Sequence, residues 1–216
     1  MPYLKACLFD LDGVIVDTAI YHYKAWKRLA NELGFDFTEH QNEELKGISR
    51  MESLELILKW GGVTLTQEEK EHWATLKNGW YLEYVNQMTP AEVLPGVKDF
   101  LEMLRDNKIK IALGSASKNA PLILERIDMK AYFDAIIDGT QTTKSKPDPE
   151  VFLLGAKALH IPPAECIVFE DAVAGIEAAH RGGMKAVGVG SPAVLTEANL
   201  VISGFVGLSL QALETV

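Results

Sequence analysis

Apolar and polar positions follow two alternating patterns along most of this chain. Short apolar runs of strand length are separated by segments whose apolar residues recur at helical spacing. This alternation is typical of a parallel α/β sheet, in which a crossover helix joins successive strands. We expect strands at Leu4–Phe9, Ile109–Gly114, Ala135–Asp138, Ile167–Phe169 and Ala186–Val189, with a weaker one near Val201. The pattern therefore predicts a doubly wound, Rossmann-like parallel sheet.

Residues 17 to about 90 interrupt the alternation. The segment from Asp17 to Met88 has apolar residues at helical spacing and no convincing strand, and it contains all four tryptophans. Large aromatic side chains can give a small helical unit a core of its own. We therefore predict a helical cap domain at 17–91, inserted into an α/β catalytic core domain formed by 1–16 and 92–216.

Composition and charge then narrow the class of protein. The 216 residues are 48% hydrophobic and 24% charged, with a net charge of −9. A nucleic-acid partner would need a basic face, so we expect none. No apolar run approaches the ~18 residues that span a bilayer. The apolar stretch after Met1 to Lys5 is also too short for a signal peptide. We expect a cytoplasmic protein with no membrane partner.

The two cysteines and four of the histidines indicate no further functional site, and no sequence pattern indicates an oligomer interface. Cys7 and Cys166 each lie in an apolar run, so we interpret both as buried free thiols and not as a disulfide. The sequence shows no coiled-coil pattern and no obvious interface stripe, so a monomer is expected. His40, His72, His160 and His180 have no motif around them and are predicted to lie on the surface.

Polar residues gather where the predicted strands end. The first strand is followed by Asp10-Leu11-Asp12-Gly13, the second by the hydroxyl-rich turn 115–119, and a later one by Glu170-Asp171. A loop before that strand holds Lys144 and Lys146. Parallel strands bring their carboxyl ends to one rim of the sheet, where ligands bind.

Each of these features has an ordinary explanation when it is taken alone. Asp171 could be a helix N-cap, residues 117–119 a plain strand-to-helix turn, and either lysine a solvated surface charge. Asp10 and Asp12 are harder to explain, because two charges ~4 Å apart repel by ~4 kcal/mol at an effective dielectric near 20. A cation, a shared proton or solvation must offset this repulsion. Taken together, the oxygen-rich set is suited to Mg²⁺.

Phosphoryl transfer would use two carboxylates in different ways. One can attack phosphorus and carry the phosphoryl group as an acyl phosphate, and the other can exchange protons with the alcohol. Asp10 and Asp12 supply such a pair, with Gly13 leaving room for close backbone approach. Ser115 and nearby N–H groups would hold phosphate oxygens, and Lys146 would offset phosphoryl charge.

Four stretches resemble, in order, the motifs of the haloacid dehalogenase-like phosphotransferases. These are DLDG at 10–13, the serine ending the second strand, the lysine of KPDP at 146–149, and the ED pair at 170–171. The resemblance implies Asp10 as nucleophile and Asp12 as general acid/base. It implies Mg²⁺ held by Asp10, the Asp12 backbone carbonyl, Glu170 and Asp171, with a helical cap that closes over the site.

The cap domain should then determine which reaction occurs: transfer of the phosphoryl group to water, as in a phosphatase, or back to the sugar, as in a mutase. A mutase must exclude water and hold a second, distal phosphate. Two stretches offer residues for such a site. LKGISRMESL at 45–54 and SASKN at 115–119 supply Lys46, Gly47, Arg50, Ser53, Ala116, Ser117, Lys118 and Asn119. Among these, an arginine is suited to bidentate phosphate binding.

Three wider stretches resemble the β-phosphoglucomutase branch of this superfamily. They are YHYKAW at 21–26, LKGISRMESL and GSASKNAPLILER at 114–126. The resemblance implies interconversion of β-D-glucose 1-phosphate and glucose 6-phosphate through glucose 1,6-bisphosphate, which is both intermediate and activator. It also implies that Arg50, Ser117 and Asn119 bind the distal phosphate. His22, together with Lys77, would couple cap closure to the position of Asp12.

Other interpretations stay open at this point. A sugar-phosphate phosphatase would use the same scaffold, and a catalytically silent sugar-phosphate-binding module would keep only the fold. His22 could be a partly buried structural histidine, and Arg50 an exposed helix charge. Val16 stands where related proteins often carry threonine, which leaves the hinge behaviour of the cap open.

Overall fold

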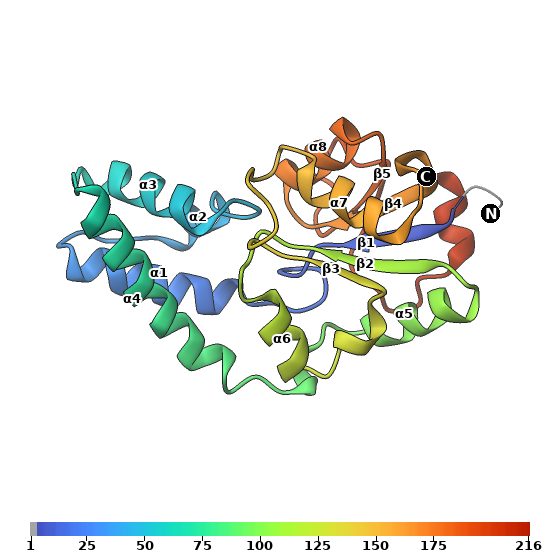
Figure 1. The fold of residues 1–216 in the computed structure, drawn as a ribbon, viewed down its shortest axis with the longest axis horizontal. Coiled ribbons are helices and arrows are strands. Elements are labelled where there is room, and N and C mark those ends of the chain that lie inside the picture. The colour runs from blue at the N-terminus through green and yellow to red at the C-terminus, as the bar shows by residue number, and fades with distance from the viewer. Residues whose placement is uncertain (1–3) are drawn as a thin grey trace.

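A six-stranded parallel sheet forms one half of the molecule, described here from a computed structural model of residues 4–216 (Figure 1). The strands lie in the order β3-β2-β1-β4-β5-β6, so β1 is central, between β2 and β4. They are β1 Ala6–Phe9, β2 Lys110–Gly114, β3 Ala135–Ile137, β4 Cys166–Glu170, β5 Lys185–Val189 and β6 Leu200–Ile202. All six predicted strands and the doubly wound α/β class are thus confirmed.

Helices cover both faces of this sheet, which explains why its central strands are continuously apolar. They are α5 Val97–Asp106, α6 Ala120–Arg126, α7 Glu150–Leu159 and α8 Val173–Arg181. Alternate residues of β1 enter different cores: Phe9 packs in one hydrophobic cluster and Leu8 in the other. The same alternation places Cys7 and Cys166 in opposite clusters as buried free thiols, as predicted.

The other half of the molecule is helical and lies beside the sheet (Figure 1). It consists of α1 Ala19–Glu32, α2 Glu39–Glu43, α3 Arg50–Gly61 and α4 Gln67–Val85. Capping boxes at Thr38, Ser49 and Thr66 satisfy the first N–H groups of α2, α3 and α4. A separate hydrophobic cluster around Trp26 and Leu54 holds this half together. The division at 17–91 stays a prediction, and residues 1–3 of the expected core domain lie outside the described part.

The two chain crossings between the halves run side by side. The backbone N–H of Leu94 donates to the carbonyl of Ile15 at 2.9 Å, and Val16 forms a backbone bridge with Val93. Val16 is fully buried there. Four short 3₁₀ turns complete the described chain: η1 Pro90–Glu92, η2 Lys130–Tyr132, η3 Pro163–Glu165 and η4 Leu210–Thr215.

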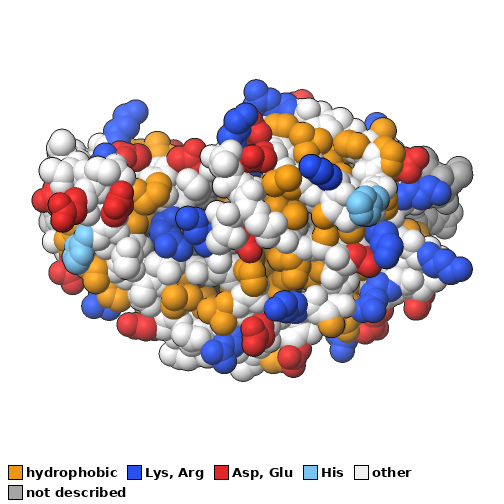
Figure 2. Space-filling model, in the orientation of Figure 1, with side chains coloured by type: hydrophobic (Ala, Val, Ile, Leu, Met, Phe, Trp, Pro, Cys, Tyr) orange, Lys and Arg blue, Asp and Glu red, His pale blue; other side chains and the backbone are white. Residues whose placement is uncertain are grey.

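The surface carries both signs of charge. On the face shown in Figure 2, acidic and basic side chains are interspersed. His40, His72, His160 and His180 are exposed, as predicted. Within residues 4–216, no helix combines the length and apolar character needed to cross a membrane.

Candidate active site

A cavity of about 1140 Å³ lies where the helical half meets the carboxyl ends of the strands. Its wall includes the end of β1, the segment before and within α3, part of α4, and the turn between β2 and α6. Every residue that the sequence nominated for the site lines this cavity, with the exception of Glu170. The topology therefore brings together residues that are far apart in the chain.

Three carboxylates gather at the floor of the cavity: Asp10 and Asp171 line it, and the fully buried Glu170 lies close beside them. Asp10 follows β1, while Glu170 and Asp171 come from the end of the neighbouring strand β4, because Phe9 and Phe169 are register partners. One oxygen from each carboxylate lies within 4.8 Å of the others. This set of hard oxygen donors could hold a divalent metal ion. Asp171 is not a helix cap, since the N-cap of α8 is Ala172.

Lys146 supplies a buried positive charge to this acidic floor. Its Nζ lies 2.5 Å from Oδ1 of Asp10 and 3.4 Å from Oε2 of Glu170. Burial alone would lower the pKa of Lys146, but Asp10 and Glu170 raise it above its ordinary value. Burial and the charge of Asp10 raise the pKa of Glu170 well above its ordinary range. Lys144, in contrast, is exposed and pairs with Asp148.

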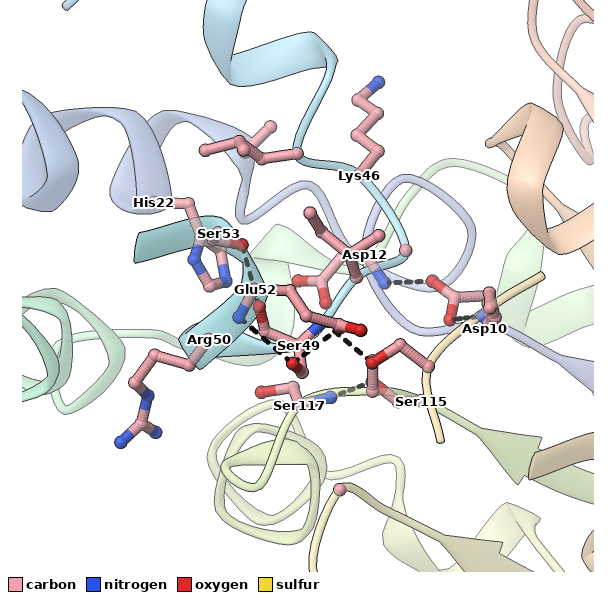
Figure 3. Close-up of a pocket in the computed structure, with 18 of the residues that line it drawn as sticks. Asp10, Asp12, His22, Lys46, Ser49, Arg50, Glu52, Ser53, Ser115 and Ser117 are labelled. Atoms are coloured by element: carbon pink, nitrogen blue, oxygen red, sulfur yellow. Dashed lines mark hydrogen bonds and ion pairs between the residues drawn. The ribbon is translucent and has the colours of Figure 1, made fainter. Parts of the chain in front are cut away.

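Asp12 lies in a different environment from Asp10. Its backbone N–H donates to Oδ2 of Asp10 at 3.0 Å, and its Oδ1 accepts a hydrogen bond from the hydroxyl of Thr18. Figure 3 shows the Asp12 side chain extending toward the middle of the cavity. Burial, followed by the charges of Asp10 and Asp171, raises the pKa of the Asp12 carboxyl to about 8. This carboxyl can therefore hold or release a proton near neutral pH.

The turn after β2 presents hydroxyl and N–H groups. Ser115 is buried, and its Oγ accepts from the backbone N–H of Ser117 at 3.1 Å (Figure 3). The next hydroxyl, of Ser117, accepts from the N–H of Asn119 at 3.2 Å. Ala116 and Lys118 line the same wall of the cavity. These bonds fix the turn, so its polar groups need little reorganisation to receive an anion.

The helical half contributes a basic roof. Lys46, from the segment after α2, reaches across to Asp171 with Nζ 3.0 Å from Oδ2. Gly47 lies close to Lys146: a Cβ atom added at this glycine would be 3.6 Å from Cδ of the lysine. Ser53 is buried on α3, where its hydroxyl donates to the carbonyl of Ser49 at 2.9 Å.

Arg50 lies on the side of the cavity away from Asp10 (Figure 3). Its side chain is partly buried, and burial lowers its pKa from the ordinary value. Within the described part of the chain, no carboxylate forms an ion pair with it. A guanidinium that lines a cavity without a counter-ion is suited to bind an anionic group of a ligand.

His22 and Lys77 form a pair that lines the cavity from the helical half. The Lys77 Nζ lies 3.0 Å from Nδ1 of His22 and 4.2 Å from the ring centre of Trp26. Burial, together with the neighbouring positive charge of Arg50, lowers the pKa of Lys77 well below its ordinary value. Burial, Lys77 and Arg50 lower the pKa of His22 in the same way.

Sequence reasoning missed three side chains that complete the site. The hydroxyl of Thr18 bonds Asp12, Oγ of Ser145 accepts from the N–H of Ser49 at 3.2 Å, and Oδ1 of Asn78 accepts from Nδ2 of Asn119 at 2.9 Å. The last two bonds join the helical half to the sheet half. Their only signal in the sequence is that Ser145 and Asn78 adjoin nominated lysines.

Comparison with known proteins agrees with this geometry. A model of the haloacid dehalogenase-like hydrolase family matches residues 4–183. The chain is 46% identical to the beta-phosphoglucomutase of Bacillus subtilis, over 98% of this chain and 94% of that protein. It is 31% identical to a phosphorylated carbohydrates phosphatase of Thermotoga maritima, over 85% and 84% of the two chains. A beta-phosphoglucomutase crystal structure from Clostridium difficile superposes with a TM-score of 0.95 at 44% identity, covering 98% of this chain and 96% of that one. The chain therefore belongs to the haloacid dehalogenase-like hydrolase family.

Proposed function

We propose that this protein is a β-phosphoglucomutase, an enzyme that interconverts β-D-glucose 1-phosphate and D-glucose 6-phosphate. The observation that supports the proposal most is that one cavity is lined by two separate sets of groups that are suited to phosphate. One set consists of Asp10, Lys146 and Ser115, and the other includes the guanidinium of Arg50, which has no carboxylate partner among residues 4–216. A substrate that carries phosphate at one end or at both fits such a cavity. The similarity to curated and structurally solved beta-phosphoglucomutases supports the same reaction.

The reaction requires two carboxyl groups with distinct tasks. An oxygen of Asp10 attacks a phosphorus of glucose 1,6-bisphosphate, the bond from that phosphorus to the sugar oxygen breaks, and Asp12 gives the departing oxygen its proton. The Lys146 ammonium and the Ser115 hydroxyl hold the oxygens of the phosphoryl group as the aspartyl phosphate forms. Phospho-Asp10 then donates its phosphoryl group to the free hydroxyl of the bound sugar phosphate, and Asp12 accepts the hydroxyl proton. The resulting glucose 1,6-bisphosphate binds again in the opposite orientation. Asp10 takes the other phosphoryl group, and Asp12 returns the proton to the departing oxygen.

The helical half would control access to these groups. Lys46 contacts Asp171 and Gly47 lies close to Lys146, while Ser53 lines the cavity from α3. Arg50, Ser117, Lys118 and Asn119 would bind the distal phosphate. The pair formed by His22 and Lys77 would link closure of residues 17–91 to the position of Asp12. A monomeric, cytoplasmic enzyme that acts on small sugar phosphates is the corresponding expectation.

The carboxylate floor fits Mg²⁺. We assign the side chains of Asp10, Glu170 and Asp171 and the backbone carbonyl of Asp12 to its site. Burial raises the pKa of Asp171 to about 6, and the charge of Asp10 adds to this effect, so a bound cation would favour the ionised form. When bound, Mg²⁺ offsets the charge between these carboxylates and the phosphoryl group.

Gly175→Ala is expected to weaken Mg²⁺ binding by displacing Glu170. A Cβ atom at Gly175 would lie 1.9 Å from Oε1 of Glu170, so the fully buried carboxylate must move. We expect the Mg²⁺ concentration for half-maximal activity to rise at least tenfold, within the ~10- to 100-fold range for residues that support metal ligands. Titration of activity with Mg²⁺ measures the change.

Gly79→Ala is the matched control for this prediction. Gly79 also lies in a helix, but a Cβ there has no neighbouring atom within 4 Å. The control should keep the wild-type Mg²⁺ requirement and gain ~0.5–1 kcal/mol of stability. A folded Gly175→Ala enzyme with an unchanged Mg²⁺ requirement would show that Glu170 does not support the metal.

Arg50→Ala is expected to separate mutase turnover from simple phosphoryl chemistry. A charged hydrogen bond contributes ~1.5–3 kcal/mol, so kcat/KM for β-glucose 1-phosphate should fall by roughly 10- to 100-fold. The rate at which acetyl phosphate phosphorylates Asp10 should stay within twofold, because this donor has no second phosphate. Arg28→Ala is the control, since Arg28 lies over the ring of Trp80 and does not line the cavity. If Arg50→Ala lowered the rates with β-glucose 1-phosphate and with acetyl phosphate equally, Arg50 would not be a ligand of the distal phosphate.

A sugar-phosphate phosphatase is the second candidate, favoured by the 31% identity to the Thermotoga maritima phosphatase. The two functions differ only in what accepts the phosphoryl group from Asp10, a sugar hydroxyl or water. The enzyme should be given β-glucose 1-phosphate with a trace of glucose 1,6-bisphosphate, and glucose 6-phosphate and free phosphate should be measured together. Dominant release of phosphate would establish the phosphatase. A mutase releases almost none.

A further inference from the structure

Asn78 lies where the two halves of the molecule meet at the cavity. It follows Lys77 on α4, and its side chain contributes to the cavity wall. Its Oδ1 accepts a hydrogen bond from Nδ2 of Asn119, which stands at the start of α6 in the sheet half, at 2.9 Å. The bond therefore links a helix of the roof directly to the turn that carries Ser117.

This bond holds the Asn119 carboxamide against α4, with its nitrogen as the donor. A carboxamide has two N–H donors on its nitrogen and only acceptor sites on its oxygen. If the Asn119 group alone were rotated by half a turn, its oxygen would face the oxygen of Asn78 without a proton between them. If both groups rotated together, Asn78 would donate to Asn119, and the N–H groups of Asn119 would still be available to a ligand. The backbone of Asn119 is held as well, since its N–H donates to Oγ of Ser117. In the observed orientation, one N–H of Asn119 is used by Asn78, and the second stays available to a ligand.

We propose that Asn78 is a positioning residue for the distal phosphate and acts through Asn119. It holds the carboxamide with an N–H donor available to the phosphate, and it can do so only while α4 lies against the turn. Recognition of the distal phosphate and closure of the helical half are thereby coupled through one bond. The inference rests on the proposed function, which makes Asn119 a ligand of that phosphate.

The chain supplies a close control for this idea. Nη2 of Arg126, at the end of α6, donates to Oδ1 of Asn86 just past α4, also at 2.9 Å. This bond also links α4 to α6, and its acceptor is again the Oδ1 atom of an asparagine. Neither Asn86 nor Arg126 lines the cavity. If a bond between the halves matters only because it favours closure, then Asn86→Ala and Asn78→Ala should have similar effects.

The test compares Asn78→Ala, Asn86→Ala, Asn119→Ala and the Asn78→Ala/Asn119→Ala double variant. We expect Asn78→Ala to raise KM for β-glucose 1-phosphate about tenfold, the order expected for one hydrogen bond, with kcat changed by less than threefold. Phosphorylation by acetyl phosphate should stay within twofold. Asn86→Ala should match the wild type in both assays. The double variant should be no worse than Asn119→Ala alone, because Asn78 acts through Asn119.

The outcomes separate this inference from the proposed function. If Asn119→Ala loses affinity for β-glucose 1-phosphate and Asn78→Ala does not, the positioning role is wrong and the distal site stands. If Asn119→Ala itself has no effect, Asn119 is not a phosphate ligand, and both assignments fail. Equal increases in KM for Asn78→Ala and Asn86→Ala would also overturn the inference. Circular dichroism of each variant verifies that the protein is folded.

Discussion

Asp10→Asn is expected to reduce mutase turnover by four orders of magnitude or more, as is typical when a nucleophile is removed (about 10⁶-fold in a well-studied protease). The carboxamide has nearly the shape of the carboxylate, and its single oxygen can keep one of the two hydrogen bonds that Asp10 accepts, from Lys146 on Oδ1 or from the N–H of Asp12 on Oδ2. It is a far weaker nucleophile toward phosphorus, so the variant should form no phosphoenzyme with acetyl phosphate or glucose 1,6-bisphosphate. Acid-quenched mass spectrometry of the protein measures the aspartyl phosphate directly.

Asp134→Asn provides the comparison for this loss. Asp134 also adjoins a strand of the sheet, where it accepts from Lys110 and the N–H of Ile111, but it does not line the cavity. The control should retain full turnover and the phosphoenzyme signal. Turnover that survives in Asp10→Asn would mean that another group carries the phosphoryl group, and the central assignment would be wrong.

Asp12→Asn should produce the second large effect, and it should be selective. Removing a general acid/base typically costs about 10²- to 10⁴-fold, so transfer between Asp10 and a sugar oxygen should fall by that factor. Acetyl phosphate releases acetate, which leaves without needing a proton. The variant should therefore be phosphorylated at close to the wild-type rate and should accumulate the aspartyl phosphate.

The neighbouring aspartate is the control for Asp12. Asp17 is exposed, and its carboxylate accepts from the N–H of Ala19 at the start of α1. Asp17→Asn can keep this bond and should turn over normally without accumulating phosphoenzyme. If Asp12→Asn instead blocks phosphorylation by acetyl phosphate, Asp12 acts before proton transfer, and its assignment as acid/base would need to be replaced.

The sheet could be predicted from the sequence because a strand that is buried on both faces appears as a continuous apolar run. β1 is apolar throughout and is followed by Asp10, while β4 is apolar up to its last residue, Glu170. Parallel topology then places Asp10 beside Glu170 and Asp171 without further information. The candidate metal-binding set could therefore be predicted from spacing and strand order together, and the family resemblance added the proposed roles.

The contacts across the cavity could not be predicted in the same way. The bond between Asn78 and Asn119 joins positions 41 residues apart, and that between Ser49 and Ser145 joins positions 96 residues apart. Both depend on how the helical half is placed against the sheet, which hydrophobic periodicity does not specify. The pairing of His22 with Lys77 was expected only from the resemblance, although the structure brings their nitrogens to 3.0 Å. The burial of Asp12, which sets its proton affinity, depends on the same placement.

The paired crossings at Ile15 and Leu94 have a consequence for how this architecture can be changed. Because the segment between them leaves and returns through hydrogen-bonded neighbours, its ends are already adjacent, whatever its length or content. A longer or different insert at this point would leave the spacing of the sheet unaltered, and the entropy of closing a longer loop grows only slowly with length. The junction is thus a natural place to exchange one lid for another, which would alter the substrates admitted while the phosphoryl chemistry on the sheet stays the same.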